Sequence, residues 1–112
     1  MELLIVILNK EEYLETILSI LVELEVLGAT ILNSEGLGHF LAYEVPIFAG
    51  LRRLVGEKKA ANKTVLALVE KENFLPRFTE LLAQENIDFT QPGTGSIFTL
   101  PVNHAITPRE ET

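Results

Sequence analysis

The order of aliphatic and amphipathic segments predicts an α+β domain with a β-α-β-β-α-β arrangement, which is the ferredoxin-like plan. Three observations support this prediction: four short aliphatic runs, two segments with helical spacing of apolar residues, and a length of 112 residues that suits one domain. In this plan two helices cover one face of a four-stranded antiparallel sheet. We therefore expect a single domain over residues 1–112, without an internal repeat.

The four predicted strands are continuous runs of largely aliphatic residues. They cover residues 3–8, 29–32, 64–69 and 96–100. Such runs are typical of strands that are buried on both faces. Because the helices would cover only one face of the sheet, the other face would stay apolar, and we expect self-association to cover it.

The two predicted helices have recognisable ends. Asn9 is expected to cap the first helix, with Glu12 completing a capping box, and that helix is expected to end before Gly28. Asn73 is expected to cap the second helix, whose first turn contains Pro76, a position at which proline is tolerated.

Composition excludes several classes of function. The chain has no cysteine, so disulfides, thiolate nucleophiles and cysteine-based zinc sites are ruled out. A net charge of −7 argues against general nucleic-acid binding. No run approaches the roughly 20 apolar residues that cross a bilayer, so we expect a cytoplasmic protein without direct membrane insertion.

Catalytic and metal-binding patterns do not emerge from the sequence. His39 and His104 are far apart and show no metal-ligand spacing, so no metal site is expected. No nucleophile has an evident base near it in sequence, and most carboxylates lie on predicted helix faces. We therefore expect a protein that is not an enzyme.

The connection between the second and third strands is the candidate functional segment. Its irregular part, residues 39–62, is about two dozen residues long, whereas connections in compact domains are commonly about 4–6 residues. Pro46 is expected to open a short helix inside it. The connection contains five of the nine basic residues: Arg52, Arg53, Lys58, Lys59 and Lys63. On an acidic chain this cluster would suit a phosphate, a carboxylate or an acidic partner; the alternative is a solvated loop.

Two Gly-X-Gly steps, at 36–38 and 93–95, flank predicted strands. Glycine permits positive φ and close approach of a ligand to the backbone, and successive N–H groups can hold a phosphate. An ordinary turn is the alternative explanation for each step. Neither step matches a Walker loop or a dinucleotide-binding fingerprint.

The segment 93–106, Gly-Thr-Gly-Ser-Ile-Phe-Thr-Leu-Pro-Val-Asn-His-Ala-Ile, resembles the C-terminal signature of the PII nitrogen-regulatory signal-transduction proteins. In that family a Gly-Asp-Gly-Lys loop leads into Ile-Phe, two further residues, Pro-Val, and then Ala-Val or Ala-Ile. Thr30 and the step at 36–38 are similar to the family's second strand and its Gly-Phe-Gly step. The similarity covers nearly the whole chain.

The resemblance implies a homotrimer that binds an adenine nucleotide between neighbouring subunits and does no chemistry. No cofactor is required, and ADP, AMP or ATP would act as the effector. The implied nucleotide-binding residues are Thr30, Gly36, Leu37, Gly38, Thr64, Val65, Gly93, Thr94, Gly95, Ser96 and Arg109. The last of these belongs to the C-terminal tail, residues 102–112, and would reach a neighbouring subunit.

The resemblance also assigns residues 39–62 to the T-loop, through which the family contacts target proteins. The implied target is a membrane transporter or a metabolic enzyme. The residues expected to bind it are Ile47, Phe48, Leu51, Arg52 and Arg53. As an alternative, the apolar residues of this set would pack a short helix onto their own subunit.

The chain departs from the family pattern at the ligand-binding positions. Ser96 stands where the family has a phosphate-binding lysine, Thr107 replaces one tail arginine, and Phe40 replaces the glutamine that holds magnesium and 2-oxoglutarate. Each lost cation removes a charge-assisted contact of about 1.5–3 kcal/mol. The reduced charge favours ADP, AMP or a cyclic nucleotide over ATP with 2-oxoglutarate.

Two other functions stay open. One is a ferredoxin-like oligomeric binding module that senses a metal ion, an amino acid or another small metabolite without binding a nucleotide. For a metal, the loop offers little beyond His39 and Glu44. The other is a structural trimer without a ligand.

Overall fold

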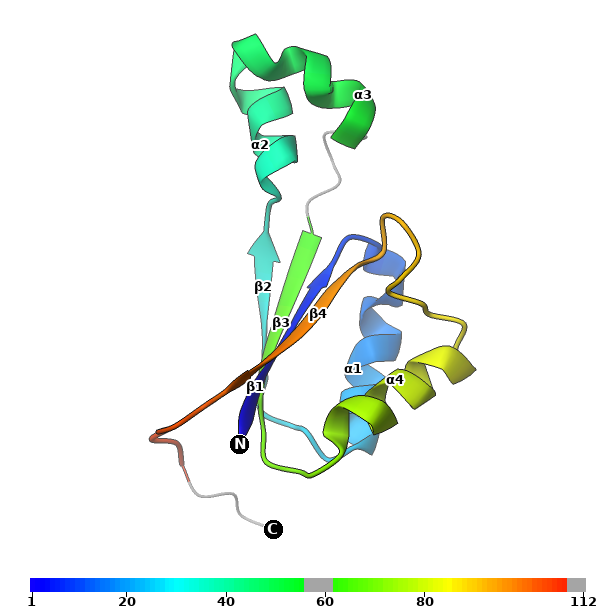
Figure 1. The fold of residues 1–112 in the computed structure, drawn as a ribbon, viewed down its shortest axis with the longest axis vertical. Coiled ribbons are helices and arrows are strands. Elements are labelled where there is room, and N and C mark those ends of the chain that lie inside the picture. The colour runs from blue at the N-terminus through cyan, green and yellow to red at the C-terminus, as the bar shows by residue number, and fades with distance from the viewer. Residues whose placement is uncertain (56–61, 109–112) are drawn as a thin grey trace.

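The computed structural model describes residues 1–55 and 62–108, which form an α+β fold around a four-stranded antiparallel sheet (Figure 1). The strands lie in the order β2-β3-β1-β4. Their bounds are β1, Glu2–Leu8; β2, Ala29–Ser34; β3, Asn62–Val69; and β4, Gly95–Pro101. This order, with two helices on one face, is compatible with the ferredoxin-like plan that the sequence predicts.

The hydrophobic core lies between the sheet and the two helices that cover it, α1 (Leu14–Glu23) and α4 (Phe74–Gln84). Alternate residues of the two central strands face this layer, as the two-residue period of a strand requires. Apolar residues at helical spacing complete the core. Its main buried side chains are Leu4, Val6, Leu8, Val65, Ala67 and Val69 from the sheet, and Ile17, Leu21, Phe78 and Leu82 from the helices.

The opposite face of the sheet is apolar and uncovered in a single chain, which confirms the expectation of an apolar open face. It presents the residues that alternate with the core positions. Leu32, Phe98 and Leu100 on this face are between 43% and 49% exposed. In a single chain the strands are therefore buried on one face only, among the residues that the structure describes.

The start of the first helix differs from the prediction, whereas its end lies before Gly28 as expected. A 3-10 turn, η1 (Glu11–Tyr13), precedes α1, and no side chain caps it. The Asn9 side chain instead accepts a hydrogen bond from Asn62 Nδ2 at 3.2 Å. The helix ends at Glu23, where Glu25 adopts a positive φ of 63° and turns the chain before Gly28. The predicted capping box is therefore wrong, because a tertiary contact takes the Asn9 side chain.

The second predicted helix begins where the sequence indicates. Asn73 occupies the N-cap position of α4, and its carbonyl accepts the Arg77 N–H at 3.3 Å. Its side chain makes no capping bond, and its φ is 58°. Pro76 lies in the first turn, as expected. An N–H group there has no acceptor within the helix, so the missing N–H of proline costs no helical hydrogen bond.

The connection from β2 to β3 carries three helical segments, which we call the tip: α2 (Leu37–Glu44), η2 (Pro46–Leu51) and α3 (Arg52–Val55). The start at Pro46 is as predicted, whereas the sequence patterns do not predict α2. Figure 1 shows the tip beyond the end of the sheet, away from α1 and α4. The tip packs on itself: Arg52 Nε donates to the Ala42 carbonyl at 2.9 Å, and its guanidinium carbon lies 4.9 Å from the centre of the Tyr43 ring.

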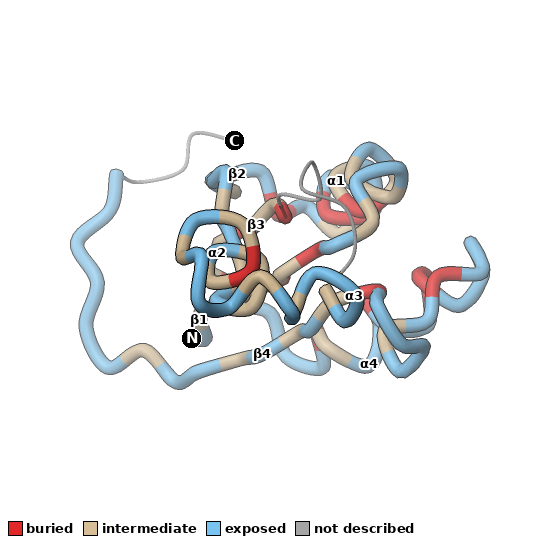
Figure 2. The backbone as a smooth tube through the Cα atoms, turned by 90° about the horizontal axis from the view of Figure 1, so that it is seen from above, coloured by how far each residue is buried: buried red, intermediate tan, exposed pale blue. Residues whose placement is uncertain are grey.

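The C-terminal segment leaves β4 without joining the core. The Val102 N–H still bonds to the Met1 carbonyl at 3.0 Å, and residues 103–108 are then exposed and run away from the sheet (Figure 2). Within the described ranges, no helix has the length and apolar character needed to cross a membrane.

Candidate functional site

Most of the predicted nucleotide-binding residues lie at one end of the sheet, where β1 and β2 end and β3 and β4 begin, whereas Thr30 lies near the start of β2 and pairs with Leu66. The strand register places Leu8 opposite both Lys63 and Gly95. It also pairs Ser34 with Asn62 at the base of the tip. Both Gly-X-Gly steps therefore lie at the end of the sheet that carries the tip.

A polar network joins three strands at this end. The Ser34 hydroxyl lies 2.5 Å from Asn62 Oδ1 and 2.7 Å from the Thr64 hydroxyl. Asn62 Nδ2 donates to Asn9 Oδ1. Asn62 is a buried polar residue, and these bonds offset the cost of burying its amide. The network ties the strand that enters the tip to the strand that leaves it.

Sequence reasoning missed this network, although it identified Thr64. Asn9, Ser34 and Asn62 each stand at the end of an aliphatic run. Polar residues at corresponding ends of neighbouring strands are the sequence feature that could have indicated the network. That signal becomes specific only when the register is known, because the register decides which ends meet.

The first Gly-X-Gly step begins a helix and does not form the expected positive-φ turn. Gly36 is the N-cap of α2 with a φ of −73°. A β-carbon on Gly38 would lie 2.8 Å from Val55 Cγ1, so this glycine permits close packing of α3 on α2. No side chain caps α2. Its first N–H groups have no helical acceptor and carry partial positive charge, which suits an anion.

The second step has the left-handed conformation that the sequence predicts. Gly93 has a φ of 82° and Gly95 a φ of 141°. A β-carbon on Gly95 would lie only 1.9 Å from the Ile7 carbonyl oxygen. Thr94 between them is 1% exposed, and its carbonyl accepts the Asn9 N–H at 2.9 Å. A ligand would therefore meet this loop through the glycine backbone and not through the Thr94 side chain.

The remaining predicted strand residues divide between the two faces of the sheet. Thr30 and Thr64 lie on the open face, and so does Ser96, which pairs with Ile7. Val65 is fully buried on the helical face. Its side chain belongs to the core, so only its backbone could contact a ligand on the open face, and its role in binding stays a prediction.

The two Gly-X-Gly steps are not brought together within one chain. The step at 36–38 follows β2 and the step at 93–95 leads into β4, and these two strands are opposite edges of the sheet with β3 and β1 between them. Three strand spacings separate these edges, about 14 Å. Arg109, the predicted contribution of the tail, lies outside the described residues. One chain therefore presents two half-sites.

Among the described residues, cations are scarce at this end of the sheet. The Lys63 side chain is held by a hydrogen bond to Asn33 Oδ1, and its Nζ lies 3.5 Å from Glu11 Oε1. These contacts keep it on the helical face, away from Ser96. Lys58 and Lys59 of the basic cluster lie outside the described residues. The described half-sites therefore present mainly backbone N–H groups and hydroxyls, and few positively charged side chains.

The residues predicted to bind a target protein lie in η2 and α3 of the tip. Ile47 is 85% exposed, and Phe48 is also exposed. Arg52 and Arg53 are exposed, and Leu51 is half-buried. In the alternative interpretation these apolar side chains pack onto their own subunit. The half-buried Leu51 agrees with that interpretation, whereas the exposed Ile47 does not.

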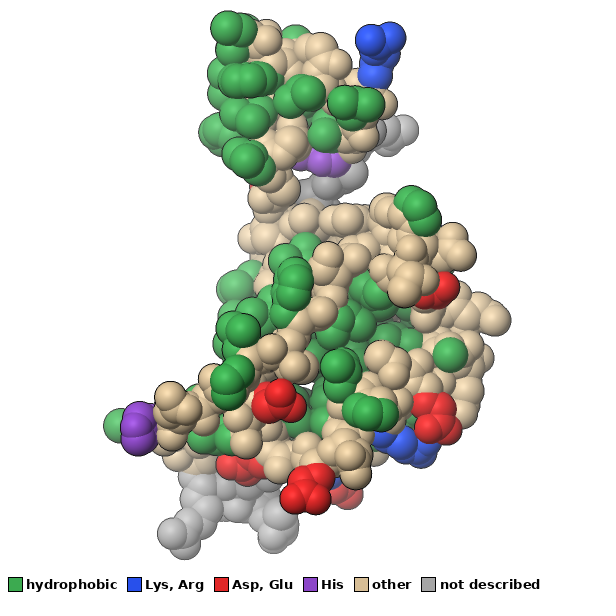
Figure 3. All heavy atoms as spheres, viewed as in Figure 1, with side chains coloured by type: hydrophobic (Ala, Val, Ile, Leu, Met, Phe, Trp, Pro, Cys, Tyr) green, Lys and Arg blue, Asp and Glu red, His purple; other side chains and the backbone are tan. Residues whose placement is uncertain are grey.

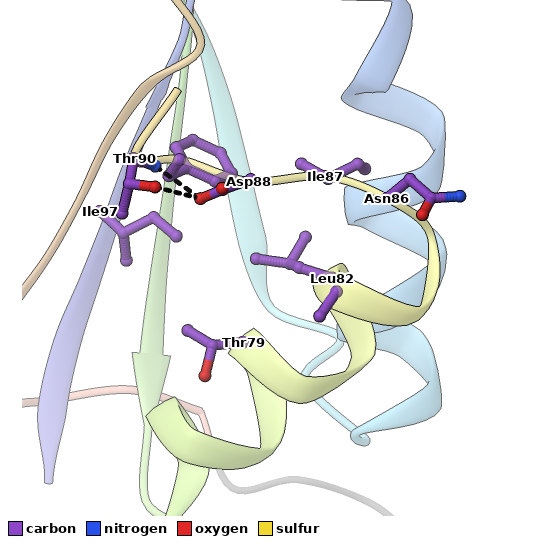
Figure 4. Close-up of a pocket in the computed structure, with 9 residues that line it drawn as sticks. Thr79, Leu82, Asn86, Ile87, Asp88, Thr90 and Ile97 are labelled. Atoms are coloured by element: carbon purple, nitrogen blue, oxygen red, sulfur yellow. Dashed lines mark hydrogen bonds between the residues drawn. The ribbon is translucent and has the colours of Figure 1, made fainter. Parts of the chain in front are cut away.

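A separate hollow lies on the helical side of the sheet, between the C-terminal end of α4, the following loop and β4 (Figure 4). Its volume is about 530 Å³. Leu82, Ile87 and Ile97 give it apolar walls. At its rim the Thr90 hydroxyl and N–H donate to Asp88 Oδ1 at 2.6 and 2.9 Å, and these bonds lower the pKa of Asp88. No pattern in the sequence indicates this hollow.

Comparisons with known proteins do not assign a family. No protein-family model matches the sequence, and no curated protein matches it significantly. Among residues 1–55 and 62–108, no group of three or more His, Cys, Asp or Glu side chains is arranged to hold a metal ion.

Proposed function

We propose that this chain is a PII-like signalling protein that binds an adenine nucleotide between the subunits of a homotrimer and acts on a target protein through its tip. One observation carries the proposal: the two candidate phosphate-binding segments lie at the same end of the sheet but on opposite edges. A site made from both segments needs two copies of the chain.

The strand directions are suited to such an assembly. All three pairings in the sheet are antiparallel, so β2 and β4 also run in opposite directions. Placing β4 of one copy beside β2 of the next would continue an antiparallel arrangement. The N-terminus of α2 would then lie near Gly93 and Gly95 of the neighbour, and both would face the same bound phosphate.

The apolar open face supports closed assembly over an open chain of subunits. Phe98 and Leu100 on β4 and Leu32 on β2 are about half exposed in a single chain. A ring in which the open faces turn inward would bury them. The number of subunits, three, comes from the resemblance to PII proteins.

The chemistry of the half-sites favours binding over catalysis. Backbone N–H groups of α2 and of residues 93–95, with the Ser96 hydroxyl, would hold phosphate oxygens, and the hydroxyls of Thr30 and Thr64 would contact the base or the ribose. With few cations among the described residues, a triphosphate would lack charge compensation. We therefore expect ADP, AMP or a cyclic nucleotide to bind more tightly than ATP.

Calorimetric titration with ATP, ADP, AMP and cyclic AMP tests this function. Ser96→Asp places a carboxylate beside the expected phosphate and should weaken binding by about tenfold or more. Gln84→Glu adds the same charge on the exposed surface of α4 and should leave binding unchanged. Sedimentation of each variant shows whether assembly is intact. Absence of binding by all four nucleotides would exclude the proposed function.

A binding module for another small metabolite is the second candidate, and the hollow beside α4 favours it. Its walls are mostly apolar, and the loop that forms its rim continues into Gly93 and Gly95. A ligand with an apolar body would suit this hollow. Binding of such a ligand that is lost in Ile97→Trp, together with no response to nucleotides, would favour this second function.

A further inference from the structure

The tip carries several large apolar side chains that its own packing leaves exposed to solvent. Ile47 is 85% exposed and Leu54 is 82% exposed. Leu37, Phe40 and Phe48, from α2 and η2, are exposed as well. Figure 3 shows hydrophobic side chains gathered along one side of the tip. Scattered apolar residues on a surface are normal, but a cluster of five within one short segment indicates a binding surface.

The charge of the tip is opposite in sign to that of the whole chain. Residues 37–55 contain Arg52 and Arg53 against Glu44, a balance of +1 when His39 is neutral. The chain as a whole carries −7, so the remainder carries −8. Arg52 is engaged inside the tip by Ala42 and Tyr43. Arg53 has no hydrogen bond or ion pair among the described residues, and its guanidinium is available to a phosphate.

The position of the tip at one end of the molecule allows a flat surface to contact it. The described molecule extends 51 Å along its longest axis, and the tip forms one end of that axis (Figure 1). A planar surface can therefore reach the tip without meeting α1 or α4. The helical segments satisfy much of their backbone hydrogen bonding internally, so their apolar side chains can enter a lipid interface with little loss of backbone hydrogen bonds.

We propose that the tip binds peripherally to an anionic lipid surface. Ile47 and Leu54 enter the interfacial region, and Arg53 contacts headgroup phosphates. This interfacial contact goes beyond the expectation of no direct membrane insertion, while no helix of the described residues could cross the bilayer. The proposal stands without the nucleotide site. In the proposed trimer, three tips at the same end of the assembly would strengthen binding through multivalency.

Co-sedimentation with lipid vesicles tests the proposal. We expect the full chain to bind vesicles of phosphatidylcholine mixed with phosphatidylglycerol, and to bind pure phosphatidylcholine vesicles more weakly. Raising the salt concentration should weaken the first interaction, because exposed charges are screened. The double variant Ile47→Ser with Leu54→Ser should lower vesicle affinity by about tenfold or more.

Matched controls separate the tip from general surface effects. Leu27→Ser with Ile106→Ser removes two apolar residues that are also highly exposed but lie outside the tip, and it should bind vesicles like the unaltered chain. Arg53→Gln should weaken binding to the anionic vesicles, whereas Arg77→Gln, which removes an exposed arginine on α4, should not. Circular dichroism checks that each variant is folded.

Several outcomes would overturn the proposal. They are no binding to anionic vesicles, equal binding to both kinds of vesicle, or equal loss of binding in the tip and control variants. The first would leave the target protein of the proposed function as the partner of the tip. Nucleotide titration of the same samples keeps the two proposals distinguishable, since the tip variants leave both half-sites intact.

Discussion

Gly95 lies at the start of β4, where the backbone approaches β1 so closely that a β-carbon would come within 1.9 Å of the Ile7 carbonyl oxygen. The contact involves main-chain atoms of a paired strand, so a side-chain rotation cannot relieve it. Gly93 and Gly95 both have a positive φ, but at Gly93 no described atom lies within 4 Å of the position that a β-carbon would take. Gly93 is favoured by its backbone conformation alone, whereas Gly95 is required by its backbone conformation and by the close approach of β1.

We predict that Gly95→Ala lowers the free energy of unfolding by about 3 kcal/mol or more, because β4 must move away from β1. Gly28→Ala is the matched control, because nothing described lies within 4 Å of the corresponding β-carbon position, and it should change stability by less than about 1 kcal/mol. Urea unfolding measures both. Similar unfolding midpoints for the two variants would show that β4 is not held closely against β1.

At the scale of elements, tertiary contacts decide where helices start and how they pack. The Asn9 side chain, a plausible cap by sequence, bonds to Asn62 of β3 instead. In the tip, Gly38 lets α3 approach α2 until Val55 fills the space of a missing side chain. Neither contact follows from local propensity, because the partners lie far apart in sequence.

An ion pair joins the turn after α1 to the segment before α4. Lys71 Nζ lies 2.6 Å from Glu25 Oε2, and this hydrogen bond, with the positive charge of Lys71, lowers the pKa of Glu25 below its ordinary value of 4.5. A lowered folded-state pKa contributes stability above the ordinary pKa. That contribution is lost as the pH falls through the folded-state pKa.

We predict that Lys71→Met raises the pKa of Glu25 toward 4.5 and weakens the dependence of stability on pH in the acid range. Titration of the Glu25 carboxyl by carbon NMR measures the pKa directly. Arg77→Met removes a cation that pairs with Glu80 and should leave Glu25 unchanged. An unaltered Glu25 pKa in Lys71→Met would mean that the pair does not form in solution.

At the scale of the whole molecule, the two faces of the sheet differ in how far they are covered. Helices α1 and α4 cover one face, and the other keeps half-exposed aliphatic and aromatic side chains. Its free edges, β2 and β4, carry the two half-sites. Assembly would bury the open face and complete the site in one step.

We predict that Phe98→Ser with Leu100→Ser dissociates the assembly, because both changes remove apolar surface from the open face. Sedimentation velocity should show a shift from trimer to monomer. Leu27→Ser, an exposed apolar position outside that face, should leave the assembly intact. A monomer in the unaltered chain would exclude the trimer, and with it a site shared between subunits.

Much of the fold could be predicted because strong local patterns and the final structure agree. All four strands appear at the aliphatic runs, and α4 begins after Asn73 as expected. The tip could not be predicted to the same degree. Its α2 begins at a Gly-X-Gly step that local reasoning assigns to a turn, and it is held by contacts from η2 and α3.

The candidate site was predicted in part. The positive φ values at Gly93 and Gly95 agree with the expected loop, whereas the Val65 side chain lies in the core and could not itself contact a ligand. A strand period of two tells which residues share a face, but it does not tell which face receives the helices. In the structure the helices cover the face that carries the Val65 side chain, and Thr64 lies on the open face.

Local sequence patterns are enough to predict the α+β class, the positions of the strands and the apolar character of both sheet faces, because periodicity and composition are local properties. Three features emerge only in the folded chain: Asn9, Ser34, Asn62 and Thr64 form one network, the two glycine steps lie at opposite edges, and the tip exposes Ile47 and Leu54. These features depend on strand register and on packing between distant segments, which no local pattern encodes.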